Sequence, residues 1–280
     1  MKTVVVTDST SYIPKHIREN LNIHMIPLSV VINGETYREE VDLNVSDFYD
    51  AVKSIETLPT TTQPPIGEFE QLYSKLAEEY DAIISIHLSS GISGTYQGAV
   101  AAAEMAENVR VYTYDSEISC MAQGFYVLEA ASMAQAGKTP EEIIPRLDEL
   151  KAEMSAYFMV DDLSHLQRGG RLSSAQAVIG SLLNIKPLLH FQDKVIVPFE
   201  KIRTRKKAMK RIVDLLAEDV EKGKFLRATI IHANRVQEAA DWKAELAVQF
   251  PTVDFSISYF GPVIGTHLGE GSMGMAWTIK

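Results

Sequence analysis

Short runs of β-branched and aromatic residues alternate with longer helical patterns along the whole chain. The runs predict strands at Thr3–Val6, Ala82–His87, Val109–Tyr114, Ala228–His232 and Phe255–Tyr259. The helical patterns lie at Ile66–Glu79, Thr95–Asn108, Met121–Ala136, Glu141–Met154, Arg205–Glu221 and Gln237–Gln249. Because parallel strands need crossover connections, usually helices, this alternation predicts an α/β fold with at least one mainly parallel sheet covered by helices.

The central part of the chain has a different pattern. Residues Ile185–Phe191 and Lys194–Phe199 flank Gln192-Asp193, which predicts a β-hairpin with a tight polar turn. A hairpin pairs its strands antiparallel, so we expect a mixed sheet in the second half. We place a domain boundary near residue 160. The expected organisation is an α/β/α domain with a mainly parallel sheet at 1–160 and an α/β domain with a mixed sheet at 161–280, with a ligand held between them.

Composition excludes several classes of protein. Hydrophobic residues make up 46% and charged residues 23%, which is ordinary for a globular chain and argues against disorder. The net charge of -10 disfavours non-specific binding of nucleic acid or anionic membrane. No apolar run approaches the roughly 18 residues of a membrane span, and the amino end turns polar too soon for a signal peptide. The single Cys120 fits a reducing cytoplasm, where we expect the protein, and its surroundings predict a buried structural thiol.

Two hydroxyl-rich segments lie at predicted element ends in the first part of the chain. In an open α/β sheet, ligands bind beyond the carboxyl ends of the strands, so loops that follow strands are the first to consider. Thr7–Ser11 follows the opening strand; its side chains can cap a helix near Pro14 or contact a ligand, and the sequence leaves both open. Thr60–Thr62, before Pro64-Pro65, predicts a stiff turn with more hydroxyls than capping requires.

The segment Ser89–Thr95 lies between a predicted strand and a predicted helix. Backbone N–H groups at a helix start carry the positive end of the helix dipole, so an anion is stabilised there without a cationic side chain. Glycines at Gly91 and Gly94 permit close approach of a ligand. A structural turn needs fewer serines and threonines than this loop contains. We therefore predict that it binds the anionic head of a small ligand.

The segment Gly265–Gly274 contains His267 and ends in a match to G-x-G-x-x-G. The dinucleotide fingerprint follows the first strand and opens a helix, whereas this segment precedes a predicted final strand, so a dinucleotide site is excluded. We expect a flexible glycine loop, in which His267 is either a ligand contact or a structural histidine.

A serine hydrolase acting on a lipid or ester is the alternative function. Ser93, Asp115 and His267 occur in the chain order of α/β-hydrolases. The nucleophile elbow requires G-x-S-x-G, however, and Thr95 stands where the second glycine should be. The scattered histidines lack an H-E-x-x-H motif, and no G-x-x-x-x-G-K-[ST] phosphate loop occurs. We expect no catalytic residues, no metal and no cofactor.

Taken together, segments through nearly the whole chain resemble the DegV family of bacterial fatty-acid-binding proteins, in the family's order and spacing. They are Thr7-Asp8-Ser9, Pro59–Pro64, Ser89–Thr95, Leu166–Arg171, Asn184–Leu189 and Gly265–Gly269. The chain departs from the family pattern at two positions. Thr62 stands where the family usually has serine and keeps the hydroxyl, whereas Glu270 replaces the usual proline and adds a negative charge beside the expected head-group loop.

The resemblance implies a two-domain carrier, not an enzyme, that holds one long-chain fatty acid with its tail buried. It implies that Ser93, Thr61 and His267 contact the carboxylate. The expected site also includes their neighbours Thr62, Gly94, Thr95 and Thr266. The resemblance further implies that a separate fatty acid kinase receives the fatty acid and makes acyl phosphate with ATP for phospholipid synthesis. Residues expected on the surface that meets this kinase are Arg168, Arg171 and Arg203.

Cations cluster at residues 201–211 against an acidic background. Because cations at the start of a helix oppose its dipole, a solvated helix face explains this cluster only in part. A docking patch for an acidic partner or for membrane phosphates stays open beside it. We expect a monomer whose partners are the fatty acid and the kinase, with transient membrane contact and no nucleic acid. A module that only binds proteins, and carries no lipid, is a third hypothesis.

Overall fold

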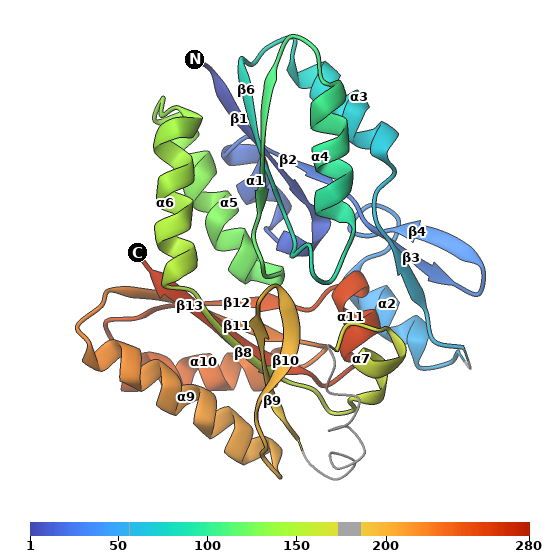
Figure 1. Cartoon of the computed structure of the whole chain (residues 1–280). Helices are drawn as coiled ribbons and strands as arrows, with labels where there is room; N and C mark the ends of the chain where they lie inside the picture. The colour runs from blue at the N-terminus through green and yellow to red at the C-terminus, as the bar shows by residue number, and fades with distance from the viewer. Residues whose placement is uncertain (56, 173–185) are drawn as a thin grey trace.

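The first sheet is parallel and comes from the amino-terminal part of the chain. The computed structural model describes residues 1–55, 57–172 and 186–280 (Figure 1). The strand order is β2-β1-β6-β7. The strands are β1 (Thr3–Asp8), β2 (Ile23–Ile26), β6 (Ala82–His87) and β7 (Arg110–Asp115). Both β1 and β6 are buried along their whole length, as the apolar strands of a parallel sheet covered on two faces should be.

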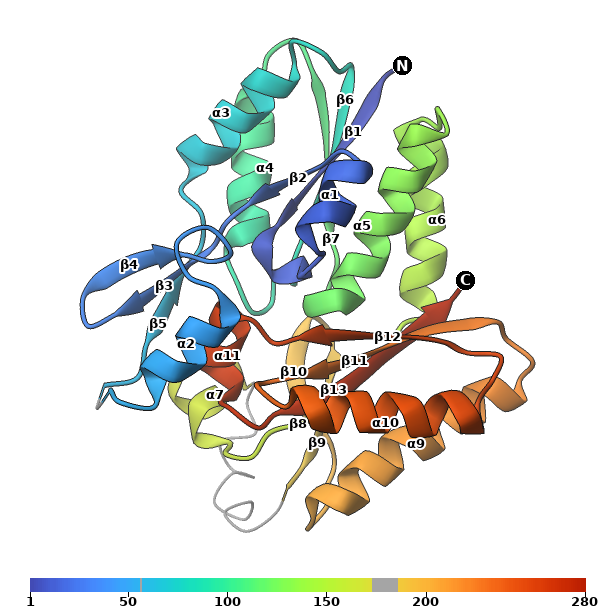
Figure 2. The same cartoon turned by 180° about the vertical axis from the view of Figure 1, so that it is seen from behind.

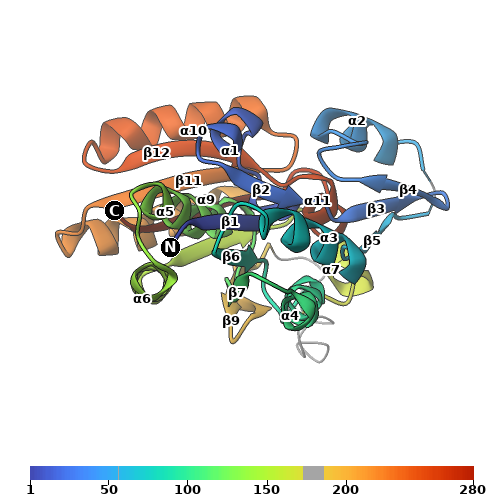
Figure 3. The same cartoon turned by 90° about the horizontal axis from the view of Figure 1, so that it is seen from above.

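Helices cover both faces of this sheet. They are α1 (Lys15–Asn20), α3 (Ile66–Leu76), α4 (Thr95–Met105), α5 (Cys120–Gln135) and α6 (Pro140–Ala152), with the short η1 (Ser9–Ser11) after β1. Successive side chains of a strand point to opposite faces. Val4 and Val6 therefore pack with α3 and α4, whereas Val5 belongs to the cluster that includes α5 (Figures 1 and 3).

The second sheet is mixed and has the order β10-β9-β8-β13-β11-β12. Its strands are β8 (Ser155–Met159), β9 (Leu188–Gln192), β10 (Val195–Glu200), β11 (Leu226–His232), β12 (Asp254–Tyr259) and β13 (Met273–Ile279). Helices α9 (Arg205–Glu221) and α10 (Val236–Gln249) pack on the face away from the first sheet, and α5 contacts the other face (Figures 1 and 2). The inner face of this sheet is thus turned toward the first sheet.

A small antiparallel sheet lies beside the first one and brings distant segments together (Figure 3). Its order is β4-β3-β5. It consists of β3 (Ser29–Ile32), β4 (Glu35–Arg38) and β5 (Thr60–Thr62), and the short helices nearby are α2 (Val45–Val52), α7 (Ser164–Arg168) and α11 (Pro262–Leu268). Helix α11 contacts β3, β5, α2 and α7. This packing places the last part of the chain against its first quarter.

The predicted α/β alternation is confirmed, and so is the central hairpin. Strands β9 and β10 pair antiparallel, with Val195 opposite Gln192. The turn residues are Asp193 and Lys194, both with positive φ (49° and 72°), which is the conformation of a type I′ turn. The turn therefore sits one residue later than the predicted Gln192-Asp193. The predicted start of the first strand, Ile185, lies outside the described residues.

Two predicted loops have regular structure instead. Thr60–Thr62 is not a turn but strand β5, with Thr61 opposite Val30 of β3. The expected flexible loop around His267 is helix α11, and the chain turns only at Gly269 and Gly271, whose φ angles are 76° and 88°. His267 is therefore held on a helix.

The structure is consistent with two domains but favours a domain boundary earlier than residue 160. Strand β8 precedes residue 160, yet it pairs with β9 and β13 of the second sheet. We therefore propose a boundary between α6 and β8 for the domains first drawn at 1–160 and 161–280. Across the described parts of the chain, no helix combines the length and the apolar character that crossing a bilayer requires.

Candidate functional site

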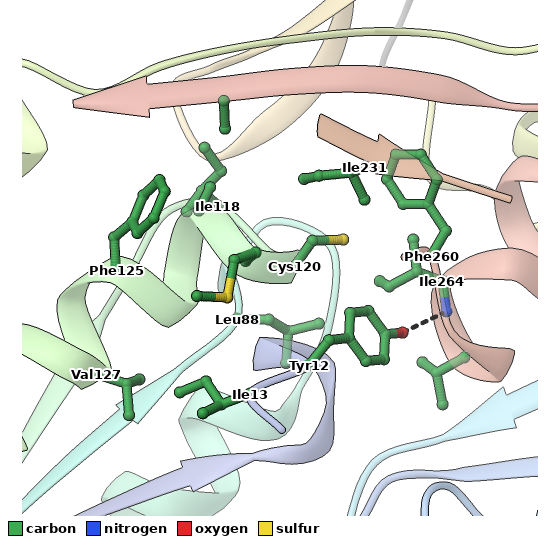
Figure 4. Close-up of a cluster of buried hydrophobic side chains, with 14 of the residues drawn as sticks. Tyr12, Ile13, Leu88, Ile118, Cys120, Phe125, Val127, Ile231, Phe260 and Ile264 are labelled. Carbon is green, nitrogen blue, oxygen red and sulfur yellow. Dashed lines mark hydrogen bonds between the residues drawn. The ribbon is translucent and has the colours of Figure 1, made fainter. Parts of the chain in front are cut away.

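A cavity of about 310 Å³ lies between the first sheet and the inner face of the second. Most of its wall is apolar and comes from loops after β6 and β7, the start of α5, strands of the second sheet, and α11. Cys120 of α5, Ile231 of β11, Ile264 of α11 and Phe260, which lies between β12 and α11, converge on this region (Figure 4). A pocket of this size and lining suits a small, largely apolar ligand.

The cavity wall also carries polar side chains. They include Thr61, Thr62, Gln63, Ser93, Arg171 and His267. Thr61 Oγ1 lies 2.9 Å from His267 Nε2. A Cβ at Gly94 would lie 2.0 Å from the Gln63 Oε1 atom, so a larger residue there would displace the Gln63 side chain. The cavity therefore has a polar region, built by β5, the loop before α4, and α11.

His267 is a neutral imidazole at physiological pH. Burial lowers the pKa of His267 to about 4, and the positive charge of Arg171 contributes in the same direction. Its Nδ1 faces Gly169, where a Cβ would lie 2.3 Å away, and it has no hydrogen-bond partner among the described residues. Nε2 faces Thr61, and both residues line the cavity. The imidazole can therefore hydrogen-bond a carboxylate without carrying a charge.

The loop Ser89–Thr95 is held in place by its own serines. Ser89 Oγ donates to the Lys194 carbonyl at 2.6 Å, and a Cβ at Gly91 would lie 2.3 Å from that same oxygen. Ser93 Oγ and Thr95 Oγ1 are 2.8 Å apart. Of this loop, Ile92, Ser93 and Gly94 line the cavity. The remaining hydroxyls therefore shape the loop, and Ser93 faces the ligand space at the start of α4.

Two residues of the expected carboxylate site lie outside the cavity wall. Thr266 donates its hydroxyl to the Pro262 carbonyl within α11 at 2.8 Å. Thr95 is fully buried beside Ser93. Their contact with the ligand stays a prediction, whereas Thr61, Thr62, Ser93, Gly94 and His267 do line the cavity. Glu270 accepts a hydrogen bond from Asn234 Nδ2 at 2.7 Å and is exposed to solvent.

Arg171 was expected on a partner surface, but it also lines the cavity. Its guanidinium donates to the carbonyls of Ile92 (3.1 Å) and Gly169 (2.6 Å), and thus lies next to the polar region. No sequence motif indicates this position of the Arg171 side chain. Arg168 and Arg203 are exposed. Arg168 donates to Ser164 of its own helix.

The segment Thr7–Ser11 does not line the cavity. Asp8 is fully buried, accepts from the Thr10 N–H and caps η1. It also accepts from the Leu88 N–H at 2.9 Å and lies 3.1 Å from His87 Nδ1. Asp8 thus caps the short η1 within the segment, whereas α1, which begins after Pro14, has no side-chain cap. Asp8 is hydrogen-bonded to the start of the loop after β6 and does not line the cavity.

The hydrolase residues are not assembled as a triad. Ser93 bonds to Thr95, and His267 bonds to Thr61. Asp115 accepts from Ser90 and from Lys194 Nζ at 3.0 Å. Within the described chain no hydrogen bond joins any two of Ser93, Asp115 and His267. The thiol of Cys120 is buried, as expected, and burial raises its pKa.

Comparison with known proteins agrees with the geometry. The family described as "Uncharacterised protein, DegV family" matches residues 2–280. The chain belongs to the DegV family. It is 62% identical to Protein DegV of Bacillus subtilis over the full length of both chains, and 54% identical to a DegV domain-containing protein of Listeria monocytogenes over 100% of this chain and 99% of the other.

Solved structures of DegV proteins have the same fold. The crystal structure of DegV from Bacillus subtilis, described as a fatty acid binding protein, has a TM-score of 0.96 and covers 100% of both chains at 62% identity. A DegV family protein from Thermus thermophilus, whose structure is described as showing fatty acid binding, has a TM-score of 0.93 at 30% identity, again over 100% of both chains. The expected family and α/β fold are therefore confirmed.

Proposed function

We propose that this chain binds a long-chain fatty acid, with the tail in the apolar cavity and the carboxylate at the polar region. The observation that carries the proposal is the neutral pair of Thr61 and His267 at the wall of a mostly apolar cavity. A carboxylate needs donors and a tail needs an apolar enclosure, and this cavity has both. The fatty acid binding described for the Bacillus subtilis and Thermus thermophilus proteins supports the same ligand.

The carboxylate is proposed to lie against Thr61, Thr62, Ser93, Gly94 and His267. Backbone N–H groups at the start of α4 add the positive end of a helix dipole beside Ser93 and Gly94. Arg171 adds a full positive charge at the edge of this region. Lipid extraction and native mass spectrometry of the purified protein test the proposal.

We further propose that the protein is a carrier that presents its fatty acid to a separate fatty acid kinase, which forms the acyl phosphate. The unassembled arrangement of Ser93, Asp115 and His267 supports a carrier rather than a hydrolase. Exposed cations support a docking surface for an acidic partner. They are Arg168, Lys201, Arg203, Lys206 and Lys207.

Other cations of the 201–211 cluster are already paired. Arg205 bonds to Asp161 and Glu238, and Arg211 bonds to Glu200 and Glu218. Fewer cations of this cluster are therefore available to a partner than the sequence indicated. A monomeric state, a cytoplasmic location and transient contact with a membrane surface belong to the same proposal. A kinase assay with charge-reversed variants tests its docking component.

A further inference from the structure

Glu39, directly after β4, is fully buried and forms the centre of a hydrogen-bonded cluster. Its Oε2 accepts from the Ser9 hydroxyl at 2.6 Å. Its Oε1 accepts from the Tyr12 hydroxyl at 3.0 Å and from the backbone N–H of Val263 at 2.8 Å. These partners come from η1, the residue after it, and the start of α11. A buried carboxyl with three donors from separate segments fixes the segments relative to one another.

The two hydroxyl donors are themselves acceptors from backbone groups. Ser9 Oγ accepts from the Leu28 N–H at 3.1 Å, and the Tyr12 hydroxyl accepts from the Ile264 N–H at 3.4 Å (Figure 4). Each hydroxyl has one hydrogen, and this arrangement directs it to Glu39. The carboxyl group therefore faces three donors, which suits an ionised acceptor.

This cluster joins two parts of the cavity wall. Leu28, Val263 and Ile264 line the cavity. The Val263 N–H donates to Glu39 itself, whereas the N–H groups of Leu28 and Ile264 donate to its hydroxyl partners Ser9 and Tyr12. The Glu39 N–H also donates to the Leu28 carbonyl at 2.8 Å. His267 follows Val263 by about one turn of the same helix, so its position depends on where the start of α11 is held.

We propose that Glu39 is a positioning residue that holds α11 so that His267 faces Thr61 and the ligand head group. This inference rests on the fatty-acid binding proposed above. Glu39 does not touch the ligand; it acts through Val263 and the helix that follows. Its ionised form makes the strongest bond to the Val263 N–H, so the hold on α11 depends on pH.

The charge state of Glu39 changes near neutrality. Burial raises the pKa of Glu39 to about 7, opposed by its bonds to Ser9, Val263 and Tyr12. Titratable and charged groups that face this cluster from the elements packed around it are Tyr12, Arg18, Glu40, Tyr49, Cys120 and Tyr259. Glu40 is paired with Arg18 at 3.1 Å, and burial raises the pKa of Tyr12. With a pKa of about 7, Glu39 itself changes charge between pH 6 and pH 8.

The test compares oleate binding by wild type, Glu39→Gln and the control Glu70→Gln, which makes the same charge change at an exposed site on α3. Isothermal titration at pH 8 should give about tenfold weaker binding for Glu39→Gln, within the usual range of coupling between sites. The ratio to wild type should approach one as pH falls below 7, because protonated Glu39 is also neutral. Ionisation of oleate is common to all three proteins and cancels in the ratio. Glu70→Gln should follow wild type.

The ¹⁵N resonances of the His267 imidazole give a second measurement, and they should shift in ligand-free Glu39→Gln but not in Glu70→Gln. Equal affinities at pH 8 with unmoved His267 resonances would overturn the proposal, as would a loss of affinity that is the same at every pH. Should Glu39→Gln fail to fold, Tyr12→Phe removes one donor without a charge change and must shift the same resonances. Wild type that binds no oleate would instead contradict the proposed function.

Discussion

Thr61 Oγ1 and His267 Nε2 lie 2.9 Å apart and join β5 to α11 across 206 positions of the chain. The two residues are far apart in the sequence, and it is the packing of α11 on the small sheet that brings them together. The pair marks a polar region of a cavity whose wall is mostly apolar. The proposed head-group site therefore depends on the tertiary packing of one short helix, α11.

The low pKa of His267 predicts a pH effect on stability. The ordinary histidine pKa is 6.5 and that of His267 is about 4, so below pH 6.5 the unfolded chain takes up a proton that the folded chain does not. Stability should therefore fall as pH drops from 6.5 toward 4, by about 1.4 kcal/mol per pH unit. Between pH 7 and pH 5, urea unfolding should show wild type losing about 2 kcal/mol more than His267→Gln. Equal losses in the two proteins would contradict the assigned pKa; titration of Glu39 is shared by both and cancels.

We expect substitution of Gly169 to weaken ligand binding, because the imidazole of His267 lies beside it. In Gly169→Ala the new Cβ would lie 2.3 Å from His267 Nδ1, so the ring must move away from its place beside Thr61. We expect weaker oleate binding and a loss of about 1–3 kcal/mol in stability, the usual cost of overpacking. Gly67→Ala is the matched control, since no atom lies within 4 Å of its new Cβ. Unchanged oleate affinity in Gly169→Ala would show that the ring position does not matter.

Ser93 and Ser90 offer a comparison within one loop. Ser93 lines the cavity, whereas the Ser90 hydroxyl donates to Asp115. Ser93→Ala should weaken oleate binding about three- to tenfold, the effect of one hydrogen bond of about 1 kcal/mol, with little change in melting temperature. Ser90→Ala should leave oleate affinity at the wild-type value. Neither protein, nor wild type, should hydrolyse an aryl ester; turnover lost only in Ser93→Ala would favour the hydrolase.

The exposed Arg203 tests the docking component of the proposed function. Arg203→Glu reverses a charge in the proposed docking surface without touching the cavity wall. Acyl-phosphate formation with a fatty acid kinase should slow about tenfold, mainly through slower association, because surface charges steer encounter. Oleate affinity should stay the same. Lys75→Glu on α3 is the control. Equal kinase rates in both variants would remove Arg203 from the surface.

The sequence was sufficient for the elements whose apolar pattern is strong. Strand Ala82–His87 and helix Arg205–Glu221 were predicted at their observed bounds, because a buried strand and an amphipathic helix each leave a periodic signal. Ser93, Thr61 and His267 were named as carboxylate contacts through the family resemblance, and all three line the cavity; the shape of the site could not be predicted.

What the sequence missed depends on tertiary contacts. Thr60–Thr62 is a strand only because β3 lies beside it. Gly265 lies inside α11. A Cβ at this position would be 2.6 Å from the Tyr49 hydroxyl, so the glycine permits close packing rather than a flexible loop. Arg171 reaches the cavity wall through bonds to Ile92 and Gly169, a direction that a long side chain does not reveal in sequence. Glu39 had no motif at all.

The most direct test of the account is native mass spectrometry of the protein purified from a bacterial host, followed by lipid extraction. The account predicts a complex with one fatty acid per chain, and loss of that fatty acid from His267→Ala under conditions in which wild type retains it. Protein that carries no lipid and takes up neither oleate nor palmitate on incubation would contradict it.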